Sequence, residues 1–506
     1  MTRQRRSSGL AWSAARALRT APVTSSRALC QLISPSRSRP IPNTFAYVAL
    51  LAWPAVCIGL FIALPIERAA IWSLLGGFLL LPSGTQIDLP LLPPIDKMSV
   101  PALSALLLCW MKGTQVPAPR PSTLLYLLAI GYILSPLFTS LGNSYELQIA
   151  GVSIPGFYPL DGLKLVGRNI LMLAPFYIGS RFLCTDDARG LLLKAVPIAA
   201  LFYSLPMLFE IRMSPQLHRW VYGYFPHQFA QTMRDGGFRP VVFLDQGIQL
   251  ALFVSMAVIA AVVLARGKMR IRRVSAAWIS AYLAVLLLLC KTLAAAFYAA
   301  VIVPLVLVTR PRTWIKISCV LLLIICAYPA LRTFDLIPVH HISQAATNVS
   351  LDRSKSFQTR VQNEDKLLAK ANDKPLFGWG AWGRNRIYDR DTGQNVSITD
   401  GGWIIEFGSW GWLGYLSIFG LLTVAAFSAL GAVGKEVTPA SATLGGLSLL
   451  LAVNLIDMLP NANFTPITLL IAGSIANAAR VRARRRTPVR RPRNDSSAPT
   501  AATVSH

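Results

Sequence analysis

Long apolar segments recur along almost the whole chain, and they limit the folds that it can adopt. About 20 apolar residues suffice to span the hydrocarbon core of a bilayer. Only 14% of the 506 residues are charged, whereas a soluble protein carries about 25%. The apolar runs are continuous and do not alternate, which excludes a β-barrel. The sequence therefore predicts an all-α polytopic membrane protein. Thirteen candidate segments cover residues 45–64, 69–82, 100–111, 122–141, 163–180, 190–209, 242–265, 274–290, 294–309, 316–331, 403–430, 439–458 and 461–479.

The net charge of +27 is concentrated in the two tails of the chain. Residues 1–43 hold eight Arg and no acid, and residues 480–493 hold eight more Arg. Arg-rich segments stay in the cytoplasm and contact anionic lipid heads. Nucleic-acid binding is disfavoured because no aromatic residues interleave with the Arg in 480–493. We therefore expect both tails to be cytoplasmic.

Basic loops between the apolar segments predict the orientation of the rest of the chain. Residues 266–273 and 310–316 are Arg- and Lys-rich, so both loops are expected to be cytoplasmic. Counting outward, residues 210–241 and 331–402 are then external. Thirteen crossings would place the N-terminal tail outside, in conflict with its charge. The segments 69–82 and 100–111 are short and flank a Pro-rich stretch. One of the two is therefore expected to be re-entrant or interfacial, and the sequence does not distinguish between them. This gives about 12 transmembrane helices.

The expected organisation has five parts. They are a basic cytoplasmic tail (1–43), a transmembrane bundle (44–330) with an external loop (210–241), a large external loop (331–402), C-terminal transmembrane helices (403–479) and a second basic cytoplasmic tail (480–506).

The two external loops contain several Arg that could bind a diphosphate. The planar guanidinium group matches two phosphate oxygens at once. The candidates are Arg234 and Arg239 in the first loop and Arg360 and Arg384 in the second. The alternative is that these Arg are solvated or pair with lipid headgroups or carboxylates, as most exposed charges do. Arg239 lies between Phe238 and Pro240 at the edge of an apolar helix, where an unused charge is costly.

Asp400 is the candidate catalytic residue. It precedes Gly401, Gly402 and an apolar run, which places a carboxylate at an external helix start. One interpretation is N-capping, which Asp does well. The other is a general base that takes a proton from an acceptor hydroxyl.

Trp379, Trp382 and Trp403 are candidates for binding sugar rings. An interfacial Trp belt is the alternative interpretation. His340-His341 and Glu364-Asp365 could suggest a metal, but no ligand spacing completes a set. We therefore expect no metal and no cofactor.

Four short motifs resemble the O-antigen ligase and polymerase family of bacterial surface-polysaccharide enzymes. They are Ser356 to Arg360, Pro-Leu-Phe-Gly-Trp-Gly at 375–380, Phe-Gly-Ser-Trp-Gly-Trp-Leu-Gly at 407–414, and Gly-Phe-Arg-Pro at 237–240. The stretch near 89–104 and Leu-Pro-Asn at 459–461 are similar to its exopolysaccharide-polymerase branch. The resemblance spans roughly residues 45–480, and its specificity comes from the order of the motifs.

The resemblance implies a C-type glycosyltransferase architecture in the bacterial inner membrane, with a periplasmic loop over a lipid-facing cleft. The implied donor is a glycan on undecaprenyl diphosphate, held by Arg residues that match Arg239 and Arg360. The implied reaction is metal-independent and inverts the anomeric carbon. Many members have a His-Asn pair at the end of the loop, where this chain has Asp400-Gly401. The base role therefore falls to Asp400 by position.

Three functions stay open at this stage. The first is a polymerase, favoured over a ligase, that transfers a lipid-linked glycan to a sugar acceptor. The second is a transporter or flippase for such glycans, which would be expected to show internal repeats. The third is a non-catalytic partner of other polysaccharide assembly proteins. Membrane lipids are expected contacts in each case, and nucleic acid in none.

Overall fold

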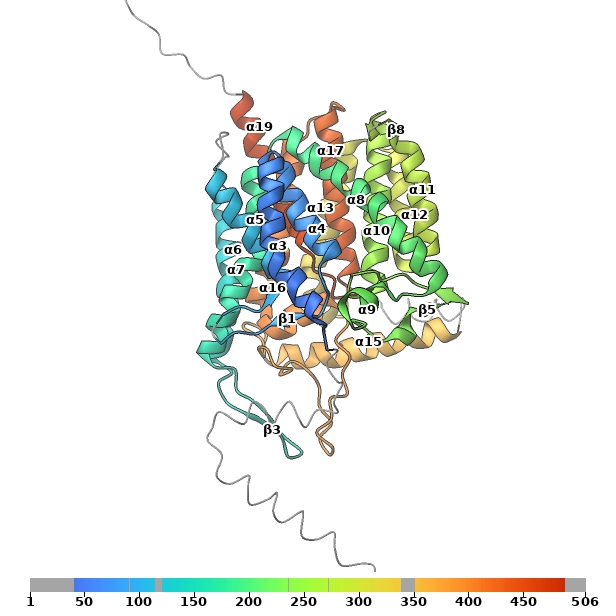
Figure 1. The fold of residues 1–506 in the computed structure, drawn as a ribbon. Coiled ribbons are helices and arrows are strands. Elements are labelled where there is room, and N and C mark those ends of the chain that lie inside the picture. The colour runs from blue at the N-terminus through green and yellow to red at the C-terminus, as the bar shows by residue number, and fades with distance from the viewer. Residues whose placement is uncertain are drawn as a thin grey trace, which may run out of the picture.

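Helices that run between two ends of a bundle make up most of the structure (Figure 1). This is a computed structural model, and it describes residues 41–90, 92–113, 121–234, 236–271, 273–337 and 351–486, with backbone alone for 351–357 and 484–486. Seven of the described helices are long and apolar enough to cross a membrane. They are α3 (Thr44–Ala63), α6 (Thr123–Leu141), α8 (Asp186–Met213), α10 (Gly247–Arg266), α13 (Pro311–Thr333), α16 (Gly402–Ala432) and α17 (Pro439–Asp457). The predicted fold class, an all-α, multi-pass membrane protein, is confirmed.

Further helices, a 3-10 helix η2 (Phe229–Thr232) and four short hairpins are also present. The additional helices are α4 (Ile66–Leu80), α5 (Ser99–Lys112), α7 (Pro159–Phe182), α9 (Leu217–Tyr222), α11 (Ala276–Leu289), α12 (Leu293–Val308), α15 (Leu351–Asn372), α18 (Pro466–Ala476) and α19 (Ala478–Arg486). The antiparallel hairpins are β1 (Gln86–Ile87) with β2 (Ile95–Asp96), β3 (Leu147–Ile149) with β4 (Val152–Ile154), β5 (Met233–Arg234) with β6 (Gly237–Phe238), and β7 (Arg270–Ile271) with β8 (Val274–Ser275).

The helix α10 forms the centre of one half of the bundle. Its apolar window is 89% buried, and it packs against α8, α11, α12 and α17. A helix that is apolar all round and enclosed by other helices belongs in the interior of a bundle. In contrast, only 28% of the window of α3 is buried, so α3 presents most of its apolar surface outward. Such a surface is expected where lipid replaces protein.

The bundle has two ends, which we call the α15 end and the α19 end (Figure 1). At the α15 end, Arg332 of α13 pairs with Asp365 of α15, and Lys291 donates to the carbonyl of Arg234. At the α19 end, Arg480 donates to the carbonyl of Pro121. The basic loop at 266–273 is at this second end, where Arg266 donates to the carbonyl of Thr309. The described parts of the loops 210–241 and 331–402 therefore share one end, opposite the basic loops.

The first and last described residues, Ile41 and Arg486, lie at opposite ends of the bundle (Figure 1). Asn43 donates to the carbonyls of Val221 and Tyr222 at the α15 end, whereas α19 defines the other end. Both α4 and α5 are shorter than the seven membrane-length helices, and the chain between them forms the β1–β2 hairpin. The count of about 12 transmembrane helices, with one early segment re-entrant or interfacial, therefore stays a prediction. Most of the tails 1–43 and 480–506 lies outside the described residues.

Thiol labelling from one side of the membrane checks this arrangement. Ile41→Cys, Arg390→Cys and Arg270→Cys each place one thiol at an exposed position in a background in which all seven native Cys are replaced. An impermeant reagent is expected to label the first two from the same side and the third from the opposite side. Labelling of Ile41→Cys together with Arg270→Cys would contradict the observed placement of the first helix.

Gly411 breaks α16 and lets a loop dock into the break. Its φ of 61° and ψ of −162° are non-helical and lie in a region that is almost restricted to Gly. An added Cβ would lie 2.5 Å from the backbone of Leu376 and of Pro375. Gly411→Ala is therefore expected to lower the free energy of unfolding by at least about 2 kcal/mol. The exposed Gly59→Ala in α3, with no atom within 4 Å of its added Cβ, is the control in the same thermal-unfolding measurement. An equal effect of both variants would contradict the account of Gly411.

Candidate functional site

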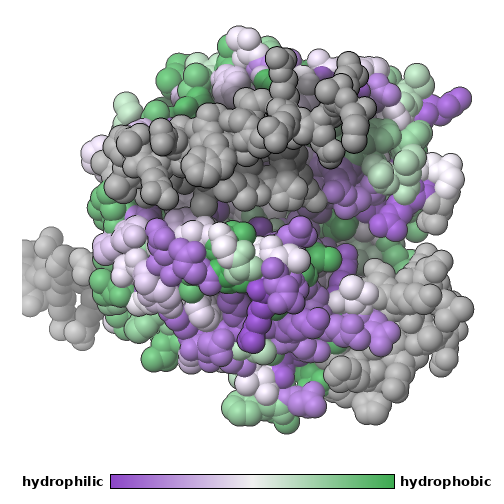
Figure 2. Space-filling view, turned by 90° about the horizontal axis from the view of Figure 1, so that it is seen from below, coloured by the Kyte–Doolittle hydropathy of each residue, from purple (hydrophilic) through white to green (hydrophobic). Residues whose placement is uncertain are grey.

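The helix α15 lies across the α15 end, roughly perpendicular to the bundle (Figure 1). Among its described side chains, Val361, Leu367, Leu368 and Ala371 are buried. Val361 and Leu368 are two helical turns apart, and Ala371 follows Leu367 and Leu368 by one turn, so the four lie on one helix face. The opposite face is polar, and Figure 2 shows hydrophilic residues gathered on the coloured part of this end of the molecule. Sequence reasoning treated 331–402 as a loop and missed this helix because its mean apolar content is low.

Three side-chain contacts fix α15 in place. Arg332 Nη2 lies 2.6 Å from Asp365 Oδ1. Asn372 donates to the Thr333 hydroxyl at 3.2 Å. Asn363 Oδ1 accepts the backbone N–H of Ile398 at 3.0 Å. The last contact brings the chain just before Asp400 onto α15.

The two Gly- and Trp-rich motifs that carry the family resemblance pack against each other. Trp379 and Gly380 donate their backbone N–H groups to the carbonyls of Gly408 and Ser409, each at 2.9 Å. Gly378 has a φ of 69°, and an added Cβ would lie 2.4 Å from the Ser409 oxygen. These glycines are therefore needed for the close approach of two backbones. The docking sets the position of the segment that leads to Asp400.

Arg360 of α15 and Asp400 form an ion pair. Arg360 Nε lies 3.6 Å from Asp400 Oδ2, and the two side chains are 46% and 44% exposed. The pair joins residues that are far apart in the sequence, and both were predicted as site residues. Partial exposure leaves both groups accessible to a ligand at the surface of the α15 end.

Asp400 does not cap α16. The N-cap residue is Gly401, and no side-chain capping hydrogen bond is present there. Instead, the N–H of Gly402 donates to the carbonyls of Met458 and Asn461, at 2.8 and 3.1 Å. The 458–461 segment thus satisfies the start of the helix. Of the two interpretations left open by the sequence, the capping one is not what the structure shows.

Glu364 is a further carboxyl group near this pair, on α15 four residues after Arg360. Burial raises its pKa to about 7, although Arg332, the Trp403 indole and Arg360 act in the opposite direction. A carboxyl group with such a pKa can exchange a proton near neutral pH. Sequence reasoning considered Glu364 only as a metal ligand. Its place at the edge of the apolar face of α15 was the signal that could have revealed it.

The raised pKa of Glu364 predicts a pH dependence of stability. A carboxyl group that binds its proton more tightly in the folded state stabilises the fold at low pH. This stabilisation is lost as the pH rises from about 4.5 to about 7. Glu364→Gln is expected to flatten the melting temperature across this range, whereas the exposed Glu146→Gln should leave the slope as in the wild type. A slope that Glu364→Gln does not change would contradict the burial of this group.

The other predicted Arg have different surroundings. Arg384 is fully buried and donates to the carbonyls of Tyr145, Pro155 and Trp379 at 2.9, 3.0 and 3.2 Å. It therefore anchors the loop rather than facing a ligand, and we leave it out of the site. Arg239 is 9% exposed and donates to the Lys291 carbonyl at 3.2 Å. The carbonyl of Arg234 accepts from Lys291 Nζ at 3.0 Å, so these two Arg lie around Lys291 at the α15 end.

The three Trp that were predicted to bind sugar also differ in their exposure. Trp382 is 49% exposed, with a φ of 65°, and remains available to a sugar. Trp379 is half-buried, with Lys374 Nζ and Lys370 Nζ 4.7 and 5.0 Å from its ring centroid. Trp403 is completely buried and packs edge-on against Tyr328 at 4.8 Å. Trp403 therefore supports the site from inside and does not present a face for stacking.

Gly402, two residues after Asp400, lines a mostly apolar pocket of about 280 Å³. The pocket lies between α7, the start of α16, α18 and the β2–α5 connection. Arg168, Asp96 and Glu406 are the ionisable residues of its lining. Glu406 Oε2 is buried and makes no hydrogen bond within the described residues. The pocket thus combines apolar walls with a few charged groups, as ligand sites commonly do.

The described residues contain no group of three His, Cys, Asp or Glu that could hold a metal ion. His340 and His341 lie outside them. Comparisons with known proteins assign no family to the chain: no family model matches it, and no curated protein matches it significantly.

Proposed function

We propose that the protein is an inner-membrane polymerase, or a ligase, that transfers a glycan from an undecaprenyl-diphosphate-linked donor to a sugar hydroxyl. The Arg360–Asp400 pair is the observation that carries this proposal. In this pair, a guanidinium group that could bind a diphosphate lies next to a carboxylate that could act as a base, and both are accessible at the surface. The motif resemblance supports the same reading. The compartment of the α15 end, the periplasm, is part of the proposal.

Arg360 suits the diphosphate of such a donor. Negative charge grows on the diphosphate as the glycosidic bond breaks, and a guanidinium group held in place stabilises that charge. Its present partner is Asp400 at 3.6 Å, longer than an ideal charge-assisted hydrogen bond. A diphosphate can therefore replace Asp400 as the partner of Arg360, which leaves the carboxylate for a second substrate.

Asp400 would take the proton from the acceptor hydroxyl. The hydroxyl oxygen attacks the anomeric carbon as the bond to the diphosphate breaks, which inverts the configuration there. The proton passes to Asp400 Oδ2 or Oδ1 and then to water, and the diphosphate lipid leaves as an anion. A positioned base of this kind contributes about 10²–10⁴-fold in rate. Glu364, whose pKa is about 7, lies on α15 together with Arg360 and can receive or return a proton at neutral pH.

The apolar pocket at Gly402 suits the first isoprenoid units of the donor. Its walls include Leu171, Met172 and Phe464, and it starts next to the segment that holds Asp400. Apolar contact there would orient the diphosphate towards α15. Trp382, exposed at the same end of the molecule, is the remaining candidate for stacking on a sugar.

Analysis of lipid-linked glycans in a strain that lacks the protein tests the proposal. A polymerase predicts accumulation of single lipid-linked repeats, and a ligase predicts accumulation of long lipid-linked chains. Expression of the wild-type gene in this strain should abolish either accumulation. Repeats retained on the cytoplasmic leaflet would show a flippase instead. An unchanged glycan profile would contradict any role in this transfer.

A further inference from the structure

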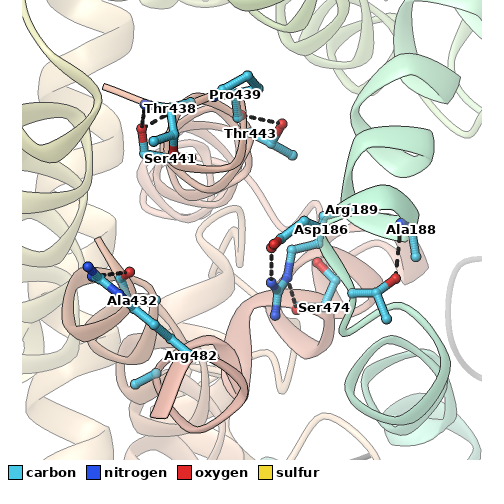
Figure 3. Close-up of polar contacts among 12 residues, drawn as sticks. Asp186, Ala188, Arg189, Ala432, Thr438, Pro439, Ser441, Thr443, Ser474 and Arg482 are labelled. Atoms are coloured by element: carbon cyan, nitrogen blue, oxygen red, sulfur yellow. Dashed lines mark hydrogen bonds and ion pairs between the residues drawn. The ribbon is translucent and has the colours of Figure 1, made fainter. Parts of the chain in front are cut away.

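A second pocket, of about 460 Å³, lies at the opposite end of the molecule. Its walls come from the start of α8, the end of α16, the start of α17, and α19. Figure 3 shows Arg189, Arg482 and the Thr438–Ser441 turn arranged around it. The pocket is thus built from four elements and is far from the site on α15.

Basic groups outnumber acidic groups in the lining of this pocket. The lining contains Arg189, Lys435 and Arg482, together with Asp186 and Glu436. Arg189 is the most constrained of the three, since it is 1% exposed. Its Nε donates to the Ser474 carbonyl at 2.8 Å and its Nη1 lies 3.0 Å from Asp186. Because Asp186 compensates the charge of Arg189, the positive excess of the lining comes from Lys435 and Arg482 against Glu436.

Two further features add positive potential. Arg482 lies against the backbone of Gly434, where an added Cβ would be 3.0 Å from its Nη2, and it donates to the Ala432 carbonyl. The 19-residue helix α17 begins at the pocket with Pro439 after its N-cap Thr438. Thr438 and Ser441 cap each other's backbone N–H groups there, so the helix contributes through its dipole, whose positive end lies at the first turn.

We propose that this pocket binds a phosphate group, either of an anionic phospholipid headgroup or of a soluble phosphorylated compound. Arg residues bind phosphate oxygens through paired N–H donors. The pocket lies at the ends of membrane-length helices, where lipid headgroups are found, and next to the Arg-rich C-terminal segment. The site does not depend on the transfer reaction proposed above.

Binding to the full-length protein tests the site, with one arm for each source of phosphate. In the first arm, inorganic phosphate is titrated against the protein in uncharged detergent at constant ionic strength. In the second, the protein is placed in nanodiscs of phosphatidylcholine with or without phosphatidylglycerol, and retained phosphatidylglycerol is counted by native mass spectrometry. Melting temperature is recorded in both arms.

The variant is Lys435→Gln with Arg482→Gln, because both side chains line the pocket and neither is fully buried. The matched control is Arg480→Gln, which removes a charge from the same helix α19 at a residue outside the lining. Wild type should bind phosphate in at least one arm, and the double variant should bind about tenfold more weakly or worse. The Arg480→Gln protein should bind as the wild type does.

The arm that responds identifies the source of the phosphate, a soluble compound in the first and a lipid in the second. Absence of binding in both arms would overturn the proposal. An equal loss in the double variant and in Arg480→Gln would also overturn it, since this would show general surface charge rather than a pocket.

Discussion

Replacing Asp400 by Asn is expected to lower the rate of glycan transfer by about 10²-fold or more. The change keeps the size of the side chain and removes the proton acceptor. The structure removes the main competing explanation, because Gly401 and not Asp400 is the N-cap of α16. Stability and donor binding should therefore stay close to those of the wild type. Initial rates of purified protein in lipid, at saturating donor, measure the effect.

Asp391→Asn is the matched control for this variant, because it changes an exposed acid in the same loop. It should transfer at the wild-type rate. Asp400→His, which introduces the residue common in the resembling family, should retain more activity than Asp400→Asn. A wild-type rate for a folded Asp400→Asn protein would remove Asp400 from the mechanism.

Replacing Arg360 by Lys is expected to cost about 10²-fold in transfer rate, the usual loss when one positioned donor to a developing negative charge is removed. Lys keeps the positive charge but lacks the planar pair of N–H groups that fits a diphosphate. The helix should remain docked, since Arg332, Asn363 and Asn372 hold it through other contacts. Rates and donor affinity are measured on the same preparation.

Arg390→Lys provides the control, as an exposed Arg in the same loop that makes no contact with Asp400 in the described structure. It should be as active as the wild type. If Arg360→Lys also transfers normally, then Arg360 does not bind the diphosphate and its pairing with Asp400 has a structural role only.

The apolar segments predicted most of the helices because the apolar character of each segment is visible within the segment itself. The segment 122–141 became α6 (Thr123–Leu141), and 439–458 became α17 (Pro439–Asp457). Lys291, which interrupts the apolar run between 274 and 309, indeed separates α11 from α12, with a φ of 49°. A charged residue between two apolar runs is a local signal, and local signals are read reliably from sequence.

The parts that depend on partners far apart in the chain were harder to predict. Arg239, Arg360 and Arg384 look alike in sequence, yet Arg384 is enclosed by carbonyls and Arg360 is exposed. Trp403 resembles an interfacial Trp, but it is buried against Tyr328. The helix α15 is a third case, because its contacts with α13 and α16 come from residues distant in the sequence.

Transfer by the purified protein tests the central proposal most directly. The full chain in lipid is given an undecaprenyl-diphosphate-linked oligosaccharide and an acceptor glycan, with a chelator present and no added nucleotide. The account predicts a lengthened glycan and one released undecaprenyl diphosphate per bond formed, with both products lost together in Asp400→Asn. Intact donor and no lengthened product, from protein whose melting temperature shows that it is folded, would contradict the account.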